Sequence, residues 1–452
     1  MGLGLHGGGV GTVRFLSEAG ANITVTDIKS KEELAPSLEK LKDLKNIKYV
    51  FGQHRPENFT AADMVIKNPA APWTNKYIQL ALENNIPVEM DSSLFFKLCK
   101  NKIIGITGTK GKTTTANLIF EILKTAGKNP IKAGIGQVSA LDKLKDLKKD
   151  SIVVFELSSW RLSGLGKAKI SPQVAVITNI YPDHLNYYKT MEEYIRDKKN
   201  IFLHQNREDD CVISGDNEIV KNFESEIKSR IIKFSKNKIQ NGQAAYIDNG
   251  AIYFNDGIDE KKVLEVSDIK LLGEHNLENV LAAVAAASAA GVKIEDIKKT
   301  ILNFSGIFHR LELARELNGV KYINDTAATT PEAAIAGINS FSAPIILIAG
   351  GSDKNLDMDK LGKVICKKIK GVVFLKGAAT EKIISAMKKT DECMANDKFQ
   401  IVESMEKAVE LAQGATEKGD IILLSPGAAS FGMFVNEFDR GDKFKEAVKK
   451  LK

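Results

Sequence analysis

The sequence predicts an α/β protein of three domains, each with a mainly parallel sheet and crossover helices. At 452 residues the chain is about three times the usual domain length of roughly 150. Its 43% hydrophobic and 27% charged residues are typical of a globular protein. Short β-branched apolar runs alternate along the chain with Gly-rich turns and with helices whose apolar residues recur every three to four positions. This alternation favours parallel sheets over all-helical or all-β folds.

We place the domain boundaries at residues 1–92, 93–304 and 305–452. The runs expected to form strands are 23–26, 47–51, 64–66 and 86–88 in the first domain, 103–106, 152–155 and 174–177 in the second, and 320–323, 345–349, 372–375 and 421–424 in the third. Alternating patches within 242–266 predict hairpins. We expect Rossmann-like N- and C-terminal domains on either side of a P-loop-type central ATPase domain.

Charge and composition exclude several classes of function. The net charge of +7 comes mainly from lysines scattered along helical stretches, without the Arg-rich or aromatic-interleaved patches that bind nucleic acid. No apolar run approaches the ~20 residues that span a bilayer, and the start has no secretion signal. The four cysteines lack the spacing of a zinc site. We therefore expect a cytoplasmic protein with neither nucleic-acid nor membrane partners.

A first Gly-rich loop stands at the start of the chain. Gly2, Gly4 and Gly7 fit the pattern G-x-G-x-x-G, and Asp27 ends the next predicted strand. Only Met1 precedes the loop, so the first strand of this domain is apparently missing. Such a loop suits any diphosphate, including that of a UDP-sugar; a nicotinamide cofactor and a purely structural turn are the alternatives. The residues expected to bind the UDP-sugar are Gly4, Leu5, His6, Gly7 and Asp27.

A second Gly-rich loop, at residues 105–115, follows an apolar strand and opens a helix. It has the shortened phosphate-loop form G-x-x-G-K-T, because Ile106 stands where the strict P-loop has Gly. Lys112 can reach the terminal phosphates of ATP, and the hydroxyl of Thr113 can bind Mg²⁺. The ATP-binding residues predicted here are Gly108, Thr109, Lys110, Gly111, Lys112, Thr113 and Thr114.

Polar residues follow the two neighbouring strands of the same predicted sheet. Glu156 ends the run 152–155, and Asp183 and His184 come shortly after 174–177. Because the carboxyl ends of parallel strands meet at one edge, these side chains are candidates to bind the same Mg²⁺. Composition alone favours an ordinary loop residue for His184, and a surface charge for Lys198.

The ordered set of motifs resembles the Mur ligase family over essentially the whole chain. The set consists of T-G-T-K-G-K-T in the phosphate loop, E-L-S-S from Glu156, D-H-L-N from Asp183, G-x-H-N-x-x-N from Gly273, H-R-L-E from His309, N-D-T from Asn324, G-G-x-x-K from Gly350 and L-S-P from Leu424. The resemblance is closest to the members of the family that add D-glutamate.

The resemblance implies a role for each matching residue. Catalysis would involve Lys112, Glu156, His184, Lys198 and Asp183, with Asp183 as a candidate proton acceptor. Thr113, Glu156, His184 and Lys198 would bind two Mg²⁺ ions, Lys198 after carbamylation by CO₂. Asn276 and Asn279 would contact adenine, Arg310 and Asp325 would close onto ATP, and Lys354 and Ser430 would lie near the carboxylates of the incoming amino acid.

The implied activity is ATP-dependent addition of D-glutamate to UDP-N-acetylmuramoyl-L-alanine, through an acyl phosphate, in peptidoglycan precursor synthesis. The enzyme would be a monomer. The chain departs from the family pattern at Ala327, Gly134 and Gly432, where Lys, Asn and Asp are common. These departures leave two alternatives open, namely a Mur-type ligase with a different amino acid and a non-catalytic ATP-binding relative.

Overall fold

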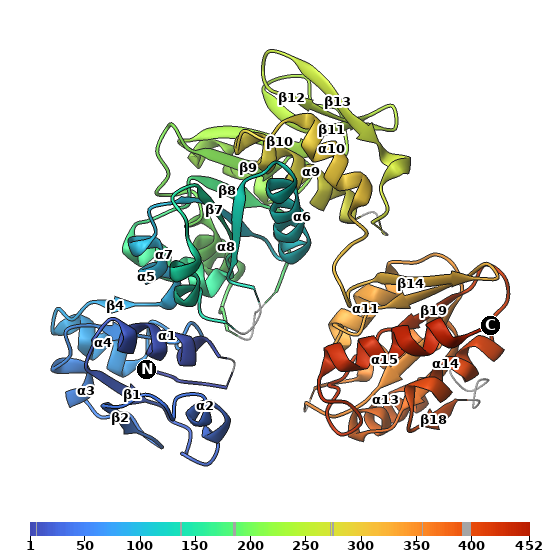
Figure 1. Cartoon of the computed structure of the whole chain (residues 1–452), viewed down its shortest axis with the longest axis horizontal. Coiled ribbons are helices and arrows are strands. Elements are labelled where there is room, and N and C mark those ends of the chain that lie inside the picture. Colours follow the sequence, from blue (N-terminus) through green and yellow to red (C-terminus); the bar gives the residue numbers. More distant parts are fainter. Residues whose placement is uncertain are drawn as a thin grey trace. The chain divides into compact units, whose positions relative to one another are not determined.

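The computed structural model describes the chain apart from residues 6, 136–137, 184–186, 272, 274, 355 and 391–398. Its contacts divide the chain into two compact units, which are described separately (Figure 1). The first unit contains Met1–Ile269 and His275–Asn303, and the second contains Lys270–Glu274 and Phe304–Lys452. The predicted boundary after residue 304 therefore lies one residue from the main division. No helix within the described residues is both long and apolar enough to cross a bilayer.

The first unit begins with two parallel strand pairs. The strands are β1 (Ile23–Thr26) with β2 (Ile47–Val50), and β3 (Val65–Ile66) with β4 (Val88–Glu89). The helices are α1 (Gly8–Glu18), α2 (Ala35–Glu39), α3 (Glu57–Thr60) and α4 (Lys76–Glu83).

The first residues of the chain link these two strand pairs. The amine of Met1 donates to the carbonyl of Ile66 at 2.9 Å, and the N–H of Gly2 donates to that of Thr26 at 2.8 Å. No strand precedes α1 in the described part of the chain. A cavity of about 790 Å³ is lined by residues of both β1 and β3.

The central sheet of the first unit carries the second Gly-rich loop. Its order is β13-β12-β11-β10-β9-β8-β5-β7-β6. The strands are β5 (Lys102–Thr107), β6 (Asn129–Ala133), β7 (Ser151–Glu156), β8 (Val174–Ile177), β9 (Asp210–Ser214), β10 (Arg230–Ser235), β11 (Gln243–Asp248), β12 (Ala251–Asn255) and β13 (Glu260–Glu265). All pairings are parallel except β11 with β12 and β12 with β13, which are the predicted hairpins.

Helices cover the central sheet, and its middle strands are accordingly apolar along their length. The helices are α5 (Asp91–Leu98), α6 (Lys112–Thr125), α7 (Ser159–Ala168), α8 (Met191–Lys199), α9 (His275–Ala289) and α10 (Ile294–Asn303), with 3-10 turns η1 (Ala140–Asp146), η2 (Val220–Glu226) and η3 (Val266–Asp268). Ile104, Val154 and Val176 are fully buried. The boundary expected between residues 92 and 93 falls inside α5, whose Leu94 and Phe95 pack into the central core.

The second unit is a six-stranded sheet with helices on both faces, in the order β14-β15-β19-β16-β17-β18. The strands are β14 (Glu312–Leu317), β15 (Val320–Asn324), β16 (Ile345–Gly350), β17 (Ile369–Leu375), β18 (Gln400–Val402) and β19 (Ile421–Leu424). The helices are α11 (Pro331–Asn339), α12 (Asp359–Lys368), α13 (Ala378–Lys388), α14 (Met405–Gly414) and α15 (Glu437–Lys450). Only β14 runs antiparallel to its neighbour, and separate apolar clusters lie on the two faces.

A pair of alanine substitutions tests the close packing at the start of α1. A Cβ on Gly9 would lie 2.2 Å from the carbonyl oxygen of Leu3, whereas a Cβ on Gly8 would meet nothing within 4 Å. We expect Gly9→Ala to lower the free energy of unfolding by about 1–3 kcal/mol through overpacking. Gly8→Ala should leave it unchanged or raise it by up to about 1 kcal/mol through helix propensity. Urea unfolding of both variants checks this, and equal effects would contradict the packing described.

Candidate active site

The second Gly-rich loop requires glycine at two positions, Gly108 and Gly111. Gly108 and Gly111 have φ angles of +152° and +83°, in the region that favours glycine. A Cβ on Gly108 would lie 1.9 Å from Oγ1 of Thr178, and one on Gly111 would lie 2.1 Å from Oδ1 of Asn279. The loop thus turns from β5 into the N-terminus of α6 while it touches two other segments.

The segment after β8 holds this loop in place. Asn179 accepts the N–H of Thr109 with its carbonyl and the N–H of Lys110 with its side-chain oxygen, both at 2.8 Å. The Thr178 hydroxyl donates to the carbonyl of Lys110 at 2.6 Å. Thr178 and Asn179 were not among the predicted site residues, although two polar residues directly after a buried strand were the available signal.

The side chain of Lys112 folds back over the loop that precedes it. Its ammonium donates to the carbonyls of Gly108 at 2.9 Å and Thr109 at 3.1 Å. Thr113 and Thr114 occupy the same first turn of α6. The positive end of the helix and this ammonium therefore lie at one point, an arrangement that favours binding of a polyphosphate.

Lys198 lies in the protein interior beside the loop. It is 2% exposed, and its Nζ donates to the carbonyl of Gly108 at 2.9 Å and to Oγ1 of Thr107 at 3.3 Å. Burial, followed by the charge of Lys112, holds its pKa well below the ordinary value, although Asp183 and Glu156 oppose this. The reading of Lys198 as a surface charge is therefore wrong. Because burial favours the neutral amine over the ammonium, it favours the nucleophilic form of this lysine.

Tyr194 supports both the loop and this lysine. Its hydroxyl lies 3.1 Å from Oγ1 of Thr109, and the Lys198 ammonium lies 4.8 Å from the centre of its ring. Tyr194 and Lys198 come from the same helix, α8, at a spacing of four residues that places both side chains on one face.

Glu156 lies at the carboxyl edge of the sheet, as predicted. It ends β7 opposite Ile106, the penultimate residue of β5 before the loop, and is half-buried. Asp183 lies in the segment after β8, close enough for its charge to act on Lys198. His184 lies outside the described residues. Within the described ranges, no three His, Cys, Asp or Glu side chains gather into a metal cluster.

The two asparagines expected to contact adenine lie on α9, which packs against α6. Both are buried, and the Nδ2 of Asn279 donates to Oδ1 of Asn276 at 2.9 Å. Thr115 of α6 donates to Asn279 at 3.4 Å. The structure thus places them directly beside Gly111, and their contact with adenine stays a prediction.

The first Gly-rich loop is tied together by Asp27. The Asp27 carboxylate accepts the N–H groups of Gly4 and Lys29, both at 3.0 Å, and is buried. Gly7 precedes the first turn of α1, so backbone N–H groups are available for a phosphate there. Asp27 therefore fixes the shape of the loop, and Leu5 lies within it. His6 lies outside the described residues.

In the second unit, Asp325, Lys354 and Ser430 follow the carboxyl ends of β15, β16 and β19, whereas Arg310 precedes β14. Asp325 follows β15 and accepts the Ser425 hydroxyl at 2.8 Å and the N–H of Leu311 at 3.2 Å. Burial raises its pKa to about 7. Lys354 donates to Oγ1 of Thr329 at 3.2 Å.

Other predicted residues of this unit differ in exposure. Ser430 is buried, whereas Arg310 is exposed. Ala327 donates its N–H to the carbonyl of His309 at 3.0 Å, and Gly432 is exposed.

Asp325→Asn tests the protonation of the buried carboxyl. The pKa of this group is near 4 in an unfolded chain, so its raised folded value gives stability at low pH that is lost as the pH rises through about 7. We expect the variant to exceed the wild type in unfolding free energy by roughly 4 kcal/mol at pH 8, because the pKa of the carboxyl rises from near 4 to about 7 on folding. The difference should vanish near pH 4, as measured by denaturation across the pH range. A variant less stable than the wild type at pH 8 would show that burial does not penalise the ionised carboxylate.

Comparisons with known proteins cover the whole chain. Family models match as "Mur ligase MurD-like, N-terminal domain" at residues 1–89, "Mur ligase middle domain" at 106–287 and "Mur ligase, glutamate ligase domain" at 309–427. UDP-N-acetylmuramoylalanine--D-glutamate ligase of Roseiflexus sp. (strain RS-1) is 42% identical over 99% of this chain and 97% of its own length. The enzyme of that name from Clostridioides difficile (strain 630) is 38% identical over 100% of this chain and 98% of its own length.

Solved structures of other proteins share the fold of this chain at lower sequence identity. UDP-N-acetylmuramate-alanine ligase MurC from Thermotoga maritima aligns with a TM-score of 0.57 and 20% identity, over 99% of this chain and 98% of that one. MurF from Acinetobacter baumannii aligns with a TM-score of 0.60 and 17% identity, over 94% and 91%.

Proposed function

Because the chain belongs to the Mur ligase family, we propose that it is the ATP-dependent ligase that joins D-glutamate to UDP-N-acetylmuramoyl-L-alanine. The observation that carries this proposal is the 42% identity, over nearly the full length of both chains, to a ligase of that name. The phosphate loop with its buried supporting contacts is the matching chemical feature. The product would be a precursor of peptidoglycan. Through peptidoglycan synthesis, the enzyme would contribute to cell shape and cell division.

The reaction needs a carboxylate to become an electrophile. The terminal carboxylate of the UDP-sugar substrate attacks the γ-phosphorus of ATP, and the bond to the bridging oxygen breaks to give an acyl phosphate and ADP. The amine of D-glutamate, after loss of a proton, then attacks the acyl carbon and displaces inorganic phosphate. Asp183 is our candidate to accept this proton, because it is a half-buried carboxylate in the loop after β8.

The residues of the phosphate loop would lower the charge barrier between the carboxylate and ATP. The N–H groups at the start of α6 and the Lys112 ammonium all face one point, where the phosphates would lie. Donors that are already in position stabilise charge that develops on the transferring phosphoryl group, without reorganisation.

The Thr113 hydroxyl and the Glu156 carboxylate, together with His184, would hold Mg²⁺ beside this loop. Oxygen donors suit this ion, and both described residues lie at the edge of the sheet where the loop begins, so the site fits the metal. When bound, Mg²⁺ supplies neutralisation of the charge on the β- and γ-phosphates.

Lys198 would be carbamylated. Its buried amine adds to the carbon of CO₂ and releases one proton, which leaves a carbamate with carboxylate character. The charge of Lys112 favours such an anion, and the lowered pKa favours the free amine that must react. The carbamate would serve as a ligand for a second Mg²⁺.

The second unit would bind the amino acid, with Lys354 and Ser430 near its carboxylates, while Arg310 and Asp325 contact ATP. Ala327 and Gly432 stand where relatives commonly have polar side chains. The selection of D-glutamate over other amino acids is therefore the property to test directly. In the first unit, Gly4, Leu5, His6 and Gly7 would bind the UDP diphosphate, and Asp27 would hold their loop. A cytoplasmic, monomeric enzyme stays a prediction.

Phosphate release from ATP and Mg²⁺ with UDP-N-acetylmuramoyl-L-alanine tests the proposal. We expect release on addition of D-glutamate and on no other amino acid in a panel, because the whole chain matches D-glutamate ligases. Stimulation by a different amino acid would keep the ligase and change its substrate. Phosphate release with none of the amino acids in the panel would favour a non-catalytic ATP-binding relative.

Removal of the loop cation or of the edge carboxylate should abolish ligation. We expect Lys112→Ala and Glu156→Ala each to lower kcat by at least about a hundredfold, the loss typical of a positioned electrostatic group. Lys124→Ala, an exposed lysine in the last turn of the same helix, is the control for charge alone. Circular dichroism would check that the variants fold. Near-normal turnover in either site variant would rule out this phosphate and metal site.

The dependence of activity on CO₂ tests the modification of Lys198. Enzyme degassed at mildly acidic pH should lose activity and regain it in bicarbonate, because carbamates decompose when they are protonated. Lys198→Arg should be inactive in both conditions, since a guanidinium keeps its proton. A carbonyl signal from ¹³C-bicarbonate in the wild type alone would identify the group. Activity indifferent to bicarbonate, without this signal, would exclude carbamylation.

A further inference from the structure

Two residues with left-handed backbone stand on either side of Arg310 in the second unit. His309 has a φ of +68° and Leu311 a φ of +44°. Such values are uncommon for residues with a side chain and persist only where surrounding contacts impose them. Arg310 itself is exposed, and its N–H donates to the carbonyl of Ile307 at 3.1 Å. The segment 309–311 is therefore a strained turn that presents an arginine.

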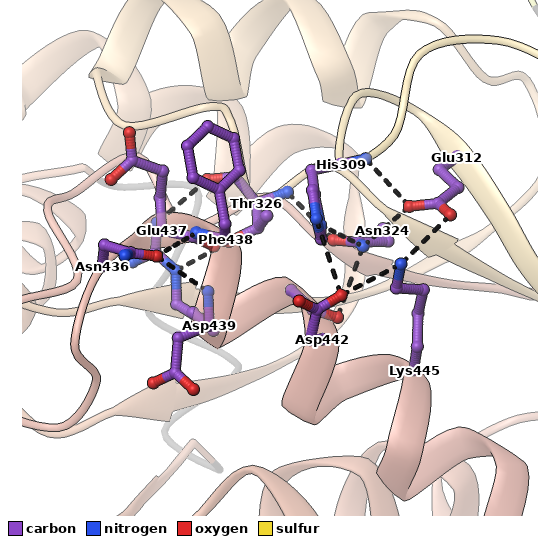
Figure 2. Close-up of polar contacts among 12 residues, drawn as sticks. His309, Glu312, Asn324, Thr326, Asn436, Glu437, Phe438, Asp439, Asp442 and Lys445 are labelled. Carbon is purple, nitrogen blue, oxygen red and sulfur yellow. Dashed lines mark hydrogen bonds and ion pairs between the residues drawn. The ribbon is translucent and has the colours of Figure 1, made fainter.

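The ring of His309 fastens one side of this turn to the body of the unit (Figure 2). The residue is 8% exposed, and its ring centre lies 5.5 Å from that of Phe438 on α15. A Cβ on Gly441 would come within 2.3 Å of its Nδ1, so α15 carries a glycine where the ring packs. On the other side of the turn, the N–H of Leu311 is held by Asp325.

The hydrogen bonds of Asn324 define which nitrogen of His309 carries the proton. The Oδ1 of Asn324 accepts the N–H of Thr326 at 3.3 Å, so its Nδ2 faces Nδ1 of His309, at 3.1 Å. Nδ1 must then accept, which leaves the proton on Nε2, 3.6 Å from Asp442 Oδ1. This tautomer is assigned from the hydrogen-bond network.

The charges around the ring agree with a neutral imidazole. Burial and, after it, the charge of Lys445 lower the pKa of His309, against the opposing effects of Asp442 and Glu312. Lys445 is itself paired with Glu312 and Asp442 (Figure 2). Glu312 also accepts the N–H of His309 at 2.8 Å, so both the backbone and the ring of this residue are fixed.

We propose that His309 is a positioning residue, which holds the strained turn so that Arg310 is presented to ATP. The inference rests on the proposed function, because it takes Arg310 to contact the nucleotide. His309 does not touch substrate in this account; it acts through the turn. Loss of the ring should release the left-handed backbone and let Arg310 adopt other directions, so the penalty should fall on ATP more than on D-glutamate.

Three variants separate positioning from general stability. His309→Ala removes the ring and disfavours the left-handed backbone. His309→Asn keeps both a side-chain acceptor near the place of Nδ1 and a residue that tolerates positive φ. Val448→Ala creates a cavity under the same helix α15, away from the turn, and is the control for destabilisation.

The measurement is the KM for ATP, the KM for D-glutamate and kcat in each variant, with thermal unfolding alongside. We expect His309→Ala to raise the KM for ATP about tenfold, with less than about a threefold change for D-glutamate. His309→Asn should restore the KM for ATP to within about threefold of the wild type. Val448→Ala should lower the unfolding temperature without changing the balance between the two KM values.

Two results would overturn the inference. The first is a normal KM for ATP in His309→Ala, and the second is a rise that Val448→Ala reproduces at equal loss of stability. Both require an active wild type, so they are distinct from failure of the proposed function. A wild type without D-glutamate-dependent phosphate release would overturn the proposed function, and this inference with it.

Discussion

The close approach of two side chains, those of Thr178 and Asn279, to the phosphate loop is the constraint on which the rest of the central domain depends. Gly108 meets Thr178 and Gly111 meets Asn279, at distances where no Cβ could fit. The loop is consequently shaped by the end of β8 on one side and by α9 on the other. These neighbours keep the loop open at the N-terminus of α6 before any ligand arrives, which is the preorganisation that phosphoryl transfer requires.

Much of the fold could be predicted from the sequence because the residues of the buried strands form continuous apolar runs. Each expected run of the first two domains and of 320–323, 345–349, 372–375 and 421–424 overlaps a strand, although 86–88 shares only Val88 with β4. The Mur ligase assignment and the α/β class are confirmed by the family models and the solved structures. The order of motifs carried this information, since their polar residues gather at the ends of parallel strands.

Other features left no local signal. The strands β6, β9, β10, β14 and β18 were not predicted. β6, β14 and β18 lie at the edges of their sheets and are only partly buried, and Asp210 and Ser214 are buried inside β9 despite their polarity. The role of Asp27 as a support for its own loop, and the burial of Lys198, likewise emerge only from tertiary contacts. Family patterns pointed to Lys198, but only the folded chain shows the burial that lowers the pKa of this lysine.

The place of β19 in the second unit has a consequence for how this unit is made. β19 lies between β15 and β16, so two strands that come early in this part of the chain are joined by one that comes roughly a hundred residues later than the first. On the ribosome, the sheet lacks its middle until residues 421–424 have emerged, and the backbone N–H and C=O groups of β15 and β16 that pair with β19 lack partners there until then. Such unpaired strand edges are where incompletely folded chains associate, so the order of the strands makes the completion of this sheet a late step in its synthesis.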